Sequence, residues 1–574
     1  MDKVSKKNQM IKNRIRILRE KFKSFHIDGY IIPKNDEFFS EYAKNDRLKN
    51  ISNFTGSAGL AIILKKTNYL FVDGRYTIQA HNESIKNFKI IEIHKNMPHT
   101  IIKNCTLGFD PHLFTSGKLK RYFSNNIKLV SINENLIDKI YINKSKKTKP
   151  FFSLSETITG ESHYSKIKKI VSFLKLNKAD YLFISAPENV AWILNIRGYD
   201  NPTSPIPNCR LIIGKNNELF LIAEKKNTKE IVKEKKIKKN QLINFNGFKE
   251  LINKLRGSKF IIDNQSCSVF DEKIIMSRFK IKKKEDPVYK MKSIKNYSEI
   301  KHMINAHKID GLALTKFIYW IKNINNKKIT EVDAQNKLEK FRKMNSSYLF
   351  PSFNTIAGSG ANGAIVHYRA TMSNTKIINK NDIFLCDSGG QYKYGTTDVT
   401  RTLCFSKPKQ YIKDIFTKVL KGHIAVVVTN LDINNTGKKI DVQARKFLKK
   451  DGLDYAHGTG HGVGFFLNVH EGPQSISKYN STKIRKGMIL SNEPGFYKKN
   501  HFGIRIENLL YVKKRNNSLY FENLTLAPIE KDLINYDLLN EKEKDYLFKY
   551  HLDIYTQYSD FLNKKERKWL ASLI

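Results

Sequence analysis

Five side chains in the second half of the chain have the types and spacing expected of ligands for a pair of metal ions. They are two aspartates, one histidine and two glutamates: Asp387, Asp398, His461, Glu493 and Glu507. Four carboxylates and one imidazole suit divalent ions such as Mn²⁺, Co²⁺ or Zn²⁺. Two such ions roughly 3.5–4 Å apart need bridging carboxylates and a shared water, and this set provides the carboxylates. If the five residues meet in space, they predict metal-assisted hydrolysis.

The first two ligands fall in a stretch that reads as two strands joined by glycines. Ile383–Asp387 and Thr396–Phe405 are the expected strands, and Ser388–Gly395 between them contains three glycines. A loose hairpin of this kind places Asp387 and Asp398 on the same face of neighbouring strands.

The remaining ligands are expected to arrive in a similar way. Met488–Glu493 and Gly503–Glu507 read as a second strand pair, so the glutamates that end them face each other. The glycines around His461 let the backbone come close to a ligand site. Arg505 lies two residues before the last glutamate, so strand alternation puts both side chains on one face.

Each of these elements alone is weak support for a metal site. An acidic side chain at a strand end is more often part of a turn or exposed to solvent, and one glycine-rich histidine loop says little. Their ordered recurrence within residues 387–507 favours the metal site. Cys386 precedes a ligand, but strand alternation points its side chain to the opposite face, so we expect it to be packed and structural.

Length and composition indicate a large protein with several domains. A chain of 574 residues with 40% apolar and 11% aromatic residues has material for two to four packed cores. Its five cysteines are scattered, which argues against a disulfide framework and a zinc ribbon. No apolar run is long enough to span a bilayer, and the first residues are polar and charged. We therefore expect a cytoplasmic protein with no membrane partner.

The net charge of +48 raises the question of nucleic-acid binding. Lysine far outnumbers arginine, and lysine runs such as Lys233–Lys239 and Lys282–Lys284 are spread along the chain. They are not joined to a helix-turn-helix, a zinc finger or an aromatic RNA-binding motif. We interpret them as solvated lysine faces and expect no specific nucleic-acid partner, although weak binding at low salt stays open.

Alternating helices and strands predict two α/β segments before the catalytic part, the second repeating the outline of the first. The polar run Asn143–Pro150 is expected to end the first segment, and Lys282–Pro287 is expected to be a linker. After Pro528 the chain becomes charged and helical. The expected domains are 1–155, 156–288 and 289–574, the last with a C-terminal helical extension from about 528. Expected helices are 11–22, 164–176, 298–321 and one N-capped by Thr330, and expected strands include 29–33, 54–64, 70–76, 181–185, 209–214 and 259–263.

The chain resembles a known family, the pita-bread metallopeptidases, and within it the long, three-domain form of aminopeptidase P (Xaa-Pro aminopeptidase). The five proposed ligands match the metal-ligand pattern of that family. The resemblance covers most of the chain and rests on a highly specific set of motifs. In the catalytic part these are Gly363–Tyr368, Asp387–Tyr392, Gly395–Thr402, His457–Gly464, Leu467–Pro473 and Phe502–Asn508, and in the N-terminal part Phe54–Gly59, Val72–Tyr76 and Asn189–Gly198.

The resemblance implies both a fold and an activity. The fold would be α/β and α+β, with two creatinase-like N-terminal α/β domains followed by a pita-bread catalytic domain. The activity would be that of a metalloaminopeptidase hydrolysing the N-terminal Xaa-Pro bond through a dinuclear metal-activated hydroxide. A prolidase-type Xaa-Pro dipeptidase and a non-catalytic pita-bread binding protein remain alternatives, although the intact ligand set weighs against the family's metal-free branches.

The resemblance also implies roles at matching positions. Asp398 and Glu507 would bridge both metals, Asp387 would complete the shell of one, and His461 and Glu493 that of the other. Glu493 would also accept the proton from the attacking water.

Three further histidines match residues that family members use on the substrate. His367, His457 and His470 would bind the peptide and stabilise the tetrahedral intermediate. Arg505 would orient a carboxylate ligand or contact the substrate. For each histidine a plain packing role stays open, least for His470, which lies in a polar loop, and most for His367, which follows two apolar residues.

Cofactor and partners follow from the same resemblance. Two divalent ions are implied, Mn²⁺ before Zn²⁺ or Co²⁺, together with peptide substrates that carry proline in the second position. A homodimer is expected, with the tail after Pro528 as its interface, because Trp569 and its apolar neighbours lie on a terminal helix.

Overall fold

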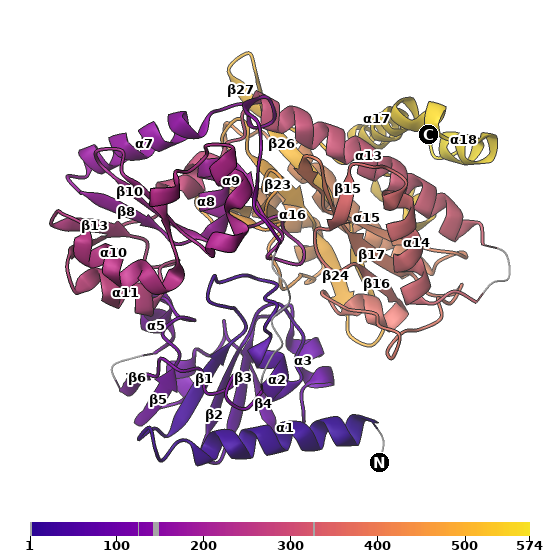
Figure 1. Ribbon diagram of the computed structural model, residues 1–574. Coiled ribbons are helices and arrows are strands. Elements are labelled where there is room, and N and C mark those ends of the chain that lie inside the picture. Colours follow the sequence, from indigo (N-terminus) through magenta and orange to yellow (C-terminus); the bar gives the residue numbers. More distant parts are fainter. Residues whose placement is uncertain (1–2, 124–125, 142–148, 325–327) are drawn as a thin grey trace. The chain divides into compact units, whose positions relative to one another are not determined.

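The structure is a computed structural model that describes residues 3–123, 126–141, 149–324 and 328–574 (Figure 1). The chain forms two compact units, Met1–Val288 and Tyr289–Ile574. A division of the first unit near residue 155 stays a prediction. Among the described residues, no helix combines the length and the apolar character needed to cross a membrane.

The first unit contains two six-stranded sheets with the same pairing pattern. Their strand orders are β4-β3-β2-β1-β5-β6 and β12-β11-β10-β8-β13-β14. β1 runs antiparallel to β2 and parallel to β5, just as β8 runs antiparallel to β10 and parallel to β13. The expected likeness of the two segments is therefore confirmed. The strands are β1 Gly29–Pro33, β2 Leu60–Leu64, β3 Asn68–Val72, β4 Phe88–Glu92, β5 Cys105–Phe109, β6 Ile127–Ser131, β8 Tyr181–Ile184, β10 Arg210–Gly214, β11 Leu219–Ile222, β12 Leu242–Ile243, β13 Lys259–Ile262 and β14 Lys280–Lys283, with β7 Phe152–Ser153 paired to β9 Ile196–Arg197.

Helices of the first unit follow the predicted apolar spacing. In α1 (Lys3–Glu20), Ile11, Ile15 and Leu18 lie on one face and are buried in a core cluster with the strands of the first sheet. The helix begins eight residues earlier than predicted. The other helices are α2 Arg47–Ser52, α3 Thr77–Glu83, α4 Pro98–Ile101, α5 Ser116–Tyr122, α6 Glu156–Thr159, α7 His163–Leu176, α8 Pro187–Leu194, α9 Lys229–Lys233, α10 Phe248–Lys254 and α11 Val269–Met276.

One predicted linker is confirmed only in part, because just residues 284–286 lie between β14 and α12 (Pro287–Ser293), next to the division at Val288; another lies mostly outside the described residues. Lys282–Pro287 begins inside β14, and Asp286 is buried, where its carboxylate accepts a hydrogen bond from Asn189 Nδ2 at 2.8 Å. The lysines of β14 face solvent while their backbone pairs with β13, which is why the run resembled a linker. Most of the polar run 143–150 falls on residues 142–148, outside the described residues.

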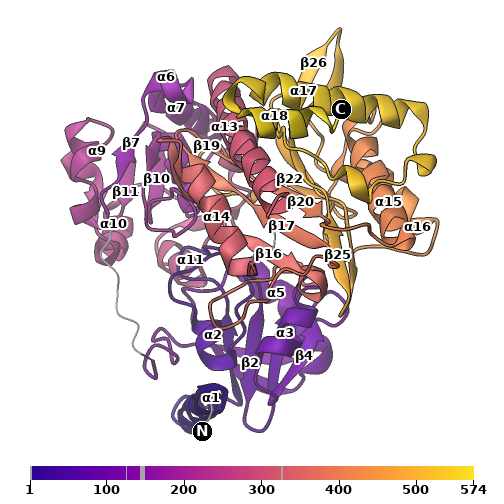
Figure 2. The same ribbon diagram turned by 90° about the vertical axis from the view of Figure 1, so that its right-hand side faces the viewer.

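Two long helices lie near the start of the second unit. α13 (Tyr297–Lys322) and α14 (Glu331–Lys343) each begin with a capping box. In this motif the N-cap side chain accepts a hydrogen bond from the backbone N–H of the third helical residue, and the side chain of that residue accepts one from the N-cap N–H. Thr330 caps α14 as predicted. The other helices of this part are α12 Pro287–Ser293, α15 Gln410–Val427, α16 Gly437–Lys449, α17 Glu541–Tyr558 and α18 Lys564–Ala571. Figure 2 shows α17 and α18, in yellow, at the C-terminal end of the chain.

The strands of the second unit form four small sheets. Their orders are β16-β17-β20, β22-β21-β23-β26-β27, β15-β18-β19 and β24-β25. Cys386 lies buried in a core cluster with residues of α13 and α14, which confirms its packed, structural role. The strands are β15 Tyr348–Pro351, β16 Ile356–Ser359, β17 Phe384–Ser388, β18 Gly390–Tyr392, β19 Gly395–Thr396, β20 Val399–Leu403, β21 Gly460–Gly462, β22 Glu471–Ile476, β23 Ile489–Asn492, β24 Gly495–Lys498, β25 Phe502–Arg505, β26 Asn508–Arg515 and β27 Ser518–Asn523.

The predicted loose hairpin between β17 and β20 is wrong in its details. The connecting residues 388–395 contain β18, which pairs with β15 and β19 in a separate sheet. Gly389 makes the exit from β17 possible, because a Cβ at this position would lie 1.9 Å from the Thr397 carbonyl oxygen. The two flanking strands still pair antiparallel, as predicted.

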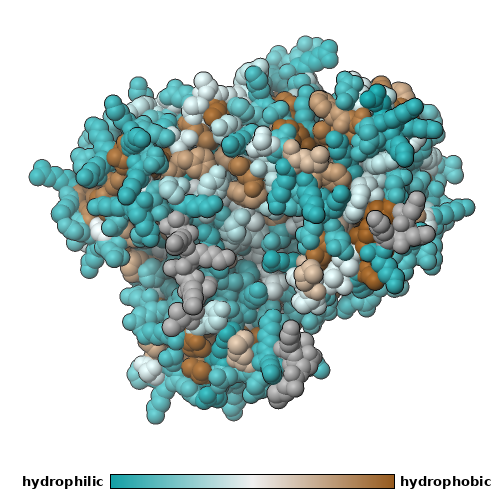
Figure 3. Space-filling model, turned by 45° about the vertical axis from the view of Figure 1, so that its right-hand side comes forward, coloured by the Kyte–Doolittle hydropathy of each residue, from teal (hydrophilic) through white to brown (hydrophobic). Residues whose placement is uncertain are grey.

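The surface is consistent with solvated lysine faces. Figure 3 shows mostly hydrophilic side chains on the face in view, with hydrophobic ones in small scattered groups. In the run 233–239, most lysines are exposed around the buried Ile237.

Candidate active site

Asp387 and Asp398 lie on the same face of the β16-β17-β20 sheet. Asp387 in β17 stands opposite Thr400 in β20, and Asp398 comes one residue before β20 begins. Side chains two residues apart on a strand share a face, so Asp398 points the same way as Thr400 and Asp387. Both aspartates are buried.

Glu493 and Glu507 come opposite each other where two strands change partners. β23 pairs with β26 up to the residue next to each glutamate, and β24 pairs with β25 on the other side. The predicted pairing of Met488–Glu493 with Gly503–Glu507 is therefore wrong. Pro494 has no backbone N–H to continue the ladder, and the strand joins a new partner immediately after it.

His461 reaches the site from β21, between two glycines that permit close backbone packing. A Cβ at Gly460 would lie 1.9 Å from the Ser491 carbonyl oxygen, so a larger residue would push the strand away. His461 Nδ1 lies 2.9 Å from the Gly462 carbonyl oxygen. A carbonyl only accepts, so Nδ1 carries a proton and Nε2 is the nitrogen that faces the site and could bind a metal ion.

The structure brings the five predicted residues into one group, in which the aspartates and Glu507 are buried and His461 and Glu493 are partly exposed. Potential ligand atoms of Asp398, His461 and Glu507 all lie within 4.8 Å of one another. His461 Nε2 lies 3.4 Å from both Asp398 Oδ2 and Glu493 Oε1. The fifth residue, Asp387, lies close enough for its negative charge to raise the pKa of Glu507.

Electrostatics show that these carboxylates cannot all stay charged without cations. Burial raises the pKa of Glu507 well above its usual range, and the charges of Asp398 and Glu493 raise it further. Burial also raises the pKa of Asp387 to about 7, although Arg505 opposes this. Two bound dications would reverse this effect and hold the acids in the ionised form that ligates metal.

The donor atoms fit a metal pair on two further counts. Asp387 Oδ1 is buried and has no hydrogen-bond partner among the described residues, so it is free to ligate. His461 is oriented with Nε2 toward the carboxylates, where burial lowers its pKa but Asp398 and Glu493 raise it to about 9. The raised pKa means that His461 Nε2 carries a proton in the absence of metal. A metal ion bound there instead would neutralise the same carboxylates, Asp398 and Glu493.

Arg505 lies on the same side as the carboxylates, beside Asp387. Its guanidinium donates to Asp387 Oδ2 at 2.6 Å, to Thr400 Oγ1 at 3.0 Å and to Tyr497 Oη at 2.7 Å. Thr400 Oγ1 in turn donates to Glu507 Oε2 at 2.7 Å. Arg505 therefore orients one carboxylate directly and a second through Thr400.

The three further histidines lie at different positions relative to this group. The His470 ring is 4.3 Å from the His461 ring, and the charge of His470 lowers the pKa of Glu493. His457 Nε2 lies 2.8 Å from Tyr497 Oη, which also accepts a hydrogen bond from Arg505. His367 lies half-buried in the turn after the 3₁₀ helix 360–364, which packs against β25. Its place in the site stays a prediction.

Tyr497 is a residue that the sequence reasoning missed. Its hydroxyl bridges His457 and Arg505, and burial raises its pKa to about 12. Gly495 leaves room for it, because a Cβ at that position would lie 2.8 Å from the Tyr497 oxygen. The pairing of β24 with β25 would have identified Tyr497, since it places this residue diagonally across from Arg505.

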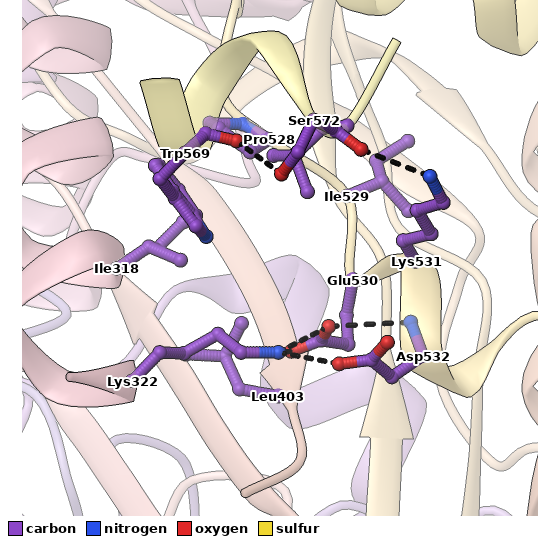
Figure 4. Close-up of a pocket in the computed structure, with 11 residues that line it drawn as sticks. Ile318, Lys322, Leu403, Pro528, Ile529, Glu530, Lys531, Asp532, Trp569 and Ser572 are labelled. Carbon is purple, nitrogen blue, oxygen red and sulfur yellow. Dashed lines mark hydrogen bonds and ion pairs between the residues drawn. The ribbon is translucent and has the colours of Figure 1, made fainter. Parts of the chain in front are cut away.

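A second acidic group lies at the far end of β20 and is occupied by a lysine. Cys404, Glu530 and Asp532 are close enough to hold an ion. Lys322 Nζ lies 2.5 Å from Glu530 and 3.0 Å from Asp532, however, and already neutralises them (Figure 4). The adjoining cavity of about 360 Å³, lined in part by Trp569 and Leu403, is therefore not the metal centre.

Four matches to known families together cover nearly all of residues 14–573. Residues 301–514 match metallopeptidase family M24, and 517–573 match the C-terminal region of peptidase M24. Residues 14–140 and 143–299 each match the creatinase/prolidase N-terminal domain.

Relatives and solved structures agree with these matches. The chain is 36% identical to the probable Xaa-Pro aminopeptidase P of Laccaria bicolor, over 97% of this chain and 92% of that protein. It is 35% identical to Xaa-Pro aminopeptidase 1 of Dictyostelium discoideum, over 98% and 96%. The X-prolyl aminopeptidase of Caenorhabditis elegans, described as a cytosolic enzyme with a di-nuclear active site, superposes with a TM-score of 0.89 at 28% identity, covering 98% of this chain and 99% of that one. The prolidase of Pyrococcus furiosus gives 0.51 at 27% identity, covering 62% and 99%.

Proposed function

The chain belongs to metallopeptidase family M24 and is an aminopeptidase of the Xaa-Pro (aminopeptidase P) kind, and from this premise we propose which residues hold its metals and which act on the peptide. The fold of two creatinase-like N-terminal domains followed by a pita-bread catalytic domain belongs to the same premise. The observation that carries the proposal is the group of four carboxylates and one oriented imidazole.

The reaction is hydrolysis of the bond between the first residue and a proline in second place. Asp398 and Glu507 would bridge two divalent ions, Asp387 would complete the shell of one, and His461 and Glu493 would complete that of the other. When bound, the metal pair supplies Lewis-acid activation of a water molecule at neutral pH. Every other step falls to the side chains around it.

Glu493 is the proton acceptor in this scheme. Burial raises its pKa, but the positive charges around it, that of His461 above all and also that of Arg505, outweigh burial and lower it overall, so the carboxylate is ionised and ready to take a proton at neutral pH. The pKa of Asp387, in contrast, is raised. Environments that shift the pKa values of two acids in opposite directions in this way suit the acids to different tasks.

The remaining side chains orient the peptide and the ligands. His470 lies beside His461, and its proposed role is to donate to the developing oxyanion of the substrate. His457 is held by Tyr497, and we propose that it contacts the peptide frame, as does His367. Arg505 positions Asp387.

Manganese is the proposed metal, since a carboxylate-rich set with one imidazole suits this hard ion. Metal analysis of the purified protein by mass spectrometry is the direct test. If zinc or cobalt were found instead, the proposed metal would be wrong, but the proposed roles of the side chains would stand.

We assign the protein to the cytoplasm, in line with the description of the Caenorhabditis elegans enzyme. We also propose a homodimer through the C-terminal tail. Trp569 does not support this, because its ring packs on Tyr319 at 5.6 Å. Phe548 and Leu552 on α17 do, because they are one turn apart and exposed. A monomer in light scattering would remove the dimer.

The test of the activity is a peptide panel on the metal-loaded protein. An Xaa-Pro-Pro tripeptide is expected to lose its first residue, and an Xaa-Pro dipeptide is expected to be a poor substrate. A preference for the dipeptide would make the protein a prolidase. Inactivity on both with Mn²⁺, Co²⁺ and Zn²⁺, without two equivalents of bound metal, would leave a non-catalytic binding protein.

A further inference from the structure

A buried ion cluster lies directly beside the histidine that we place on the substrate. Glu471 follows His470 in the chain, and its side chain is 1% exposed. Lys292 Nζ lies 3.0 Å from one carboxylate oxygen, and Lys295 Nζ contacts the other. The two lysine side chains are 2% and 0% exposed.

Burying three charged side chains costs desolvation free energy, so we expect this cluster to have a role other than packing. Lysine is almost never fully buried unless it is paired, and a buried pair is seldom a net source of stability. Here two ammonium groups share one carboxylate, and Glu299 at the start of α13 supplies a second negative charge near Lys295. An apolar trio of similar volume would serve packing at least as well.

The cluster joins two distant segments of the second unit. Lys292 lies in α12, and Lys295 lies between α12 and α13, where its backbone N–H donates to the Gly487 carbonyl at 2.9 Å. Glu471 begins β22, which pairs with the strand that carries His461. The bonds of the Glu471 carboxylate therefore hold the start of β22 in place, directly after His470.

Backbone packing leaves this strand start little freedom. A Cβ at Gly462 would lie 2.4 Å from the Glu471 carbonyl oxygen, and one at Gly464 would lie 3.2 Å from its carboxylate. A shift of Glu471 would therefore move the His470 loop against the glycine loop around His461. A displacement of about 1 Å at such a place is enough to cost roughly 100-fold in rate.

We propose that Lys292 and Lys295 are positioning residues of the active site, which hold His470 in place through the carboxylate of Glu471. The inference rests on the proposed function, because it takes His470 to act on the peptide. It adds three residues to the machinery that neither touch the metals nor contact the substrate.

The first test is Glu471→Gln, which keeps the shape and removes the charge. We expect kcat on an Xaa-Pro-Pro peptide to fall about 10- to 100-fold, with two equivalents of metal still bound. Loss of a transition-state contact lowers kcat and kcat/KM together, so KM should change little. The matched control is Glu522→Gln, in the same sheet, where the carboxylate pairs with Lys513 at 2.7 Å and is 43% exposed.

A second variant separates positioning from stability. Glu471→Leu combined with Lys292→Met and Lys295→Met removes all three charges and is expected to recover the Tm that Glu471→Gln loses. Positioning predicts that kcat stays low in this triple variant. Recovery of kcat together with Tm would overturn the proposal, and so would a kcat within twofold of the parent in Glu471→Gln.

Failure of the proposed function would look different. A parent protein that cleaves no Xaa-Pro peptide refutes the function before any variant is compared. In that event the position of His470 itself is compared in crystal structures of the parent and Glu471→Gln. A His470 ring that does not move in Glu471→Gln would then overturn the positioning role, and a displaced ring would support it.

Discussion

Replacing Tyr497 by phenylalanine should slow the reaction without disturbing the metals. The substitution removes one oxygen, which accepts from Arg505 at 2.7 Å and lies 2.8 Å from His457 Nε2. His457 Nδ1 lies 2.7 Å from the Gly458 carbonyl oxygen and so carries the proton. Burial lowers the pKa of His457 to about 4, so at neutral pH the tyrosine hydroxyl donates to Nε2.

The magnitude follows from the two bonds that are lost. A hydrogen bond to a charged group contributes about 1.5–3 kcal/mol, and the loss leaves both the guanidinium and the imidazole short of a partner. If that orientation energy is expressed in the transition state, kcat/KM falls about 10- to 100-fold. Since Tyr497 is not a proposed ligand, we expect two equivalents of metal in the variant.

The assay is release of the first residue from an Xaa-Pro-Pro peptide, with metal content measured on the same samples. Tyr479→Phe is the matched control, because its side chain is 76% exposed. A kcat/KM within twofold of the parent would refute the reasoning. So would a loss of metal in parallel with activity, since that would place Tyr497 among the groups that hold the ions.

Three further changes test other parts of the site. Glu507→Gln removes a proposed bridge and should leave at most one equivalent of metal and lower kcat at least about 100-fold; two equivalents would exclude the bridging role. Arg505→Lys loses the planar fork on Asp387 and should weaken metal affinity about 10- to 100-fold in a calorimetric titration, whereas an unchanged affinity would argue against ligand orientation. The pKa of buried His423 is lowered to about 3 from 6.5, chiefly by burial, so below pH 6.5 the unfolded chain takes up a proton that the folded chain refuses. The free energy of unfolding should therefore fall by about 2 kcal/mol from pH 7.5 to pH 5, and urea unfolding of His423→Gln should lack that part of the fall.

Local patterns in the sequence predict most elements of the fold. The spacing of apolar residues in α1 and the Thr330 cap of α14 are short-range signals, and the structure has both. The linker predicted at 282–287 begins too early, inside β14, because exposed lysines on an edge strand look like a loop. Edge strands carry charges for the same reason that loops do, since both face water.

The site was predictable in its members and less so in its geometry. Residue types and their order single out Asp398 and Glu507, and the structure places them together. Pairing of the strands around Glu493 could not be predicted, because Pro494 divides one apparent strand between two sheets. Tyr497 depends on that same register and was missed with it.

The buried lysines show the other limit. Lys292 and Lys295 lie more than 170 residues before Glu471, and nothing in their local sequence separates them from the many exposed lysines of this chain. Their role depends on packing at a long separation, which a sequence pattern of period 2 or 3.6 does not record.

The order of the two units along the chain has a consequence for synthesis. The first unit ends at Val288 with cores of its own, so it is expected to fold while the ribosome is still translating the catalytic unit. Glu507 emerges about 220 residues later, which takes roughly 10–40 s at ordinary elongation rates. Just before then the growing chain holds Asp387, Asp398, His461 and Glu493 but lacks Glu507, the second of the two proposed bridges. A nascent molecule is therefore expected to carry no working peptidase until Glu507 has been synthesised and the second unit has folded.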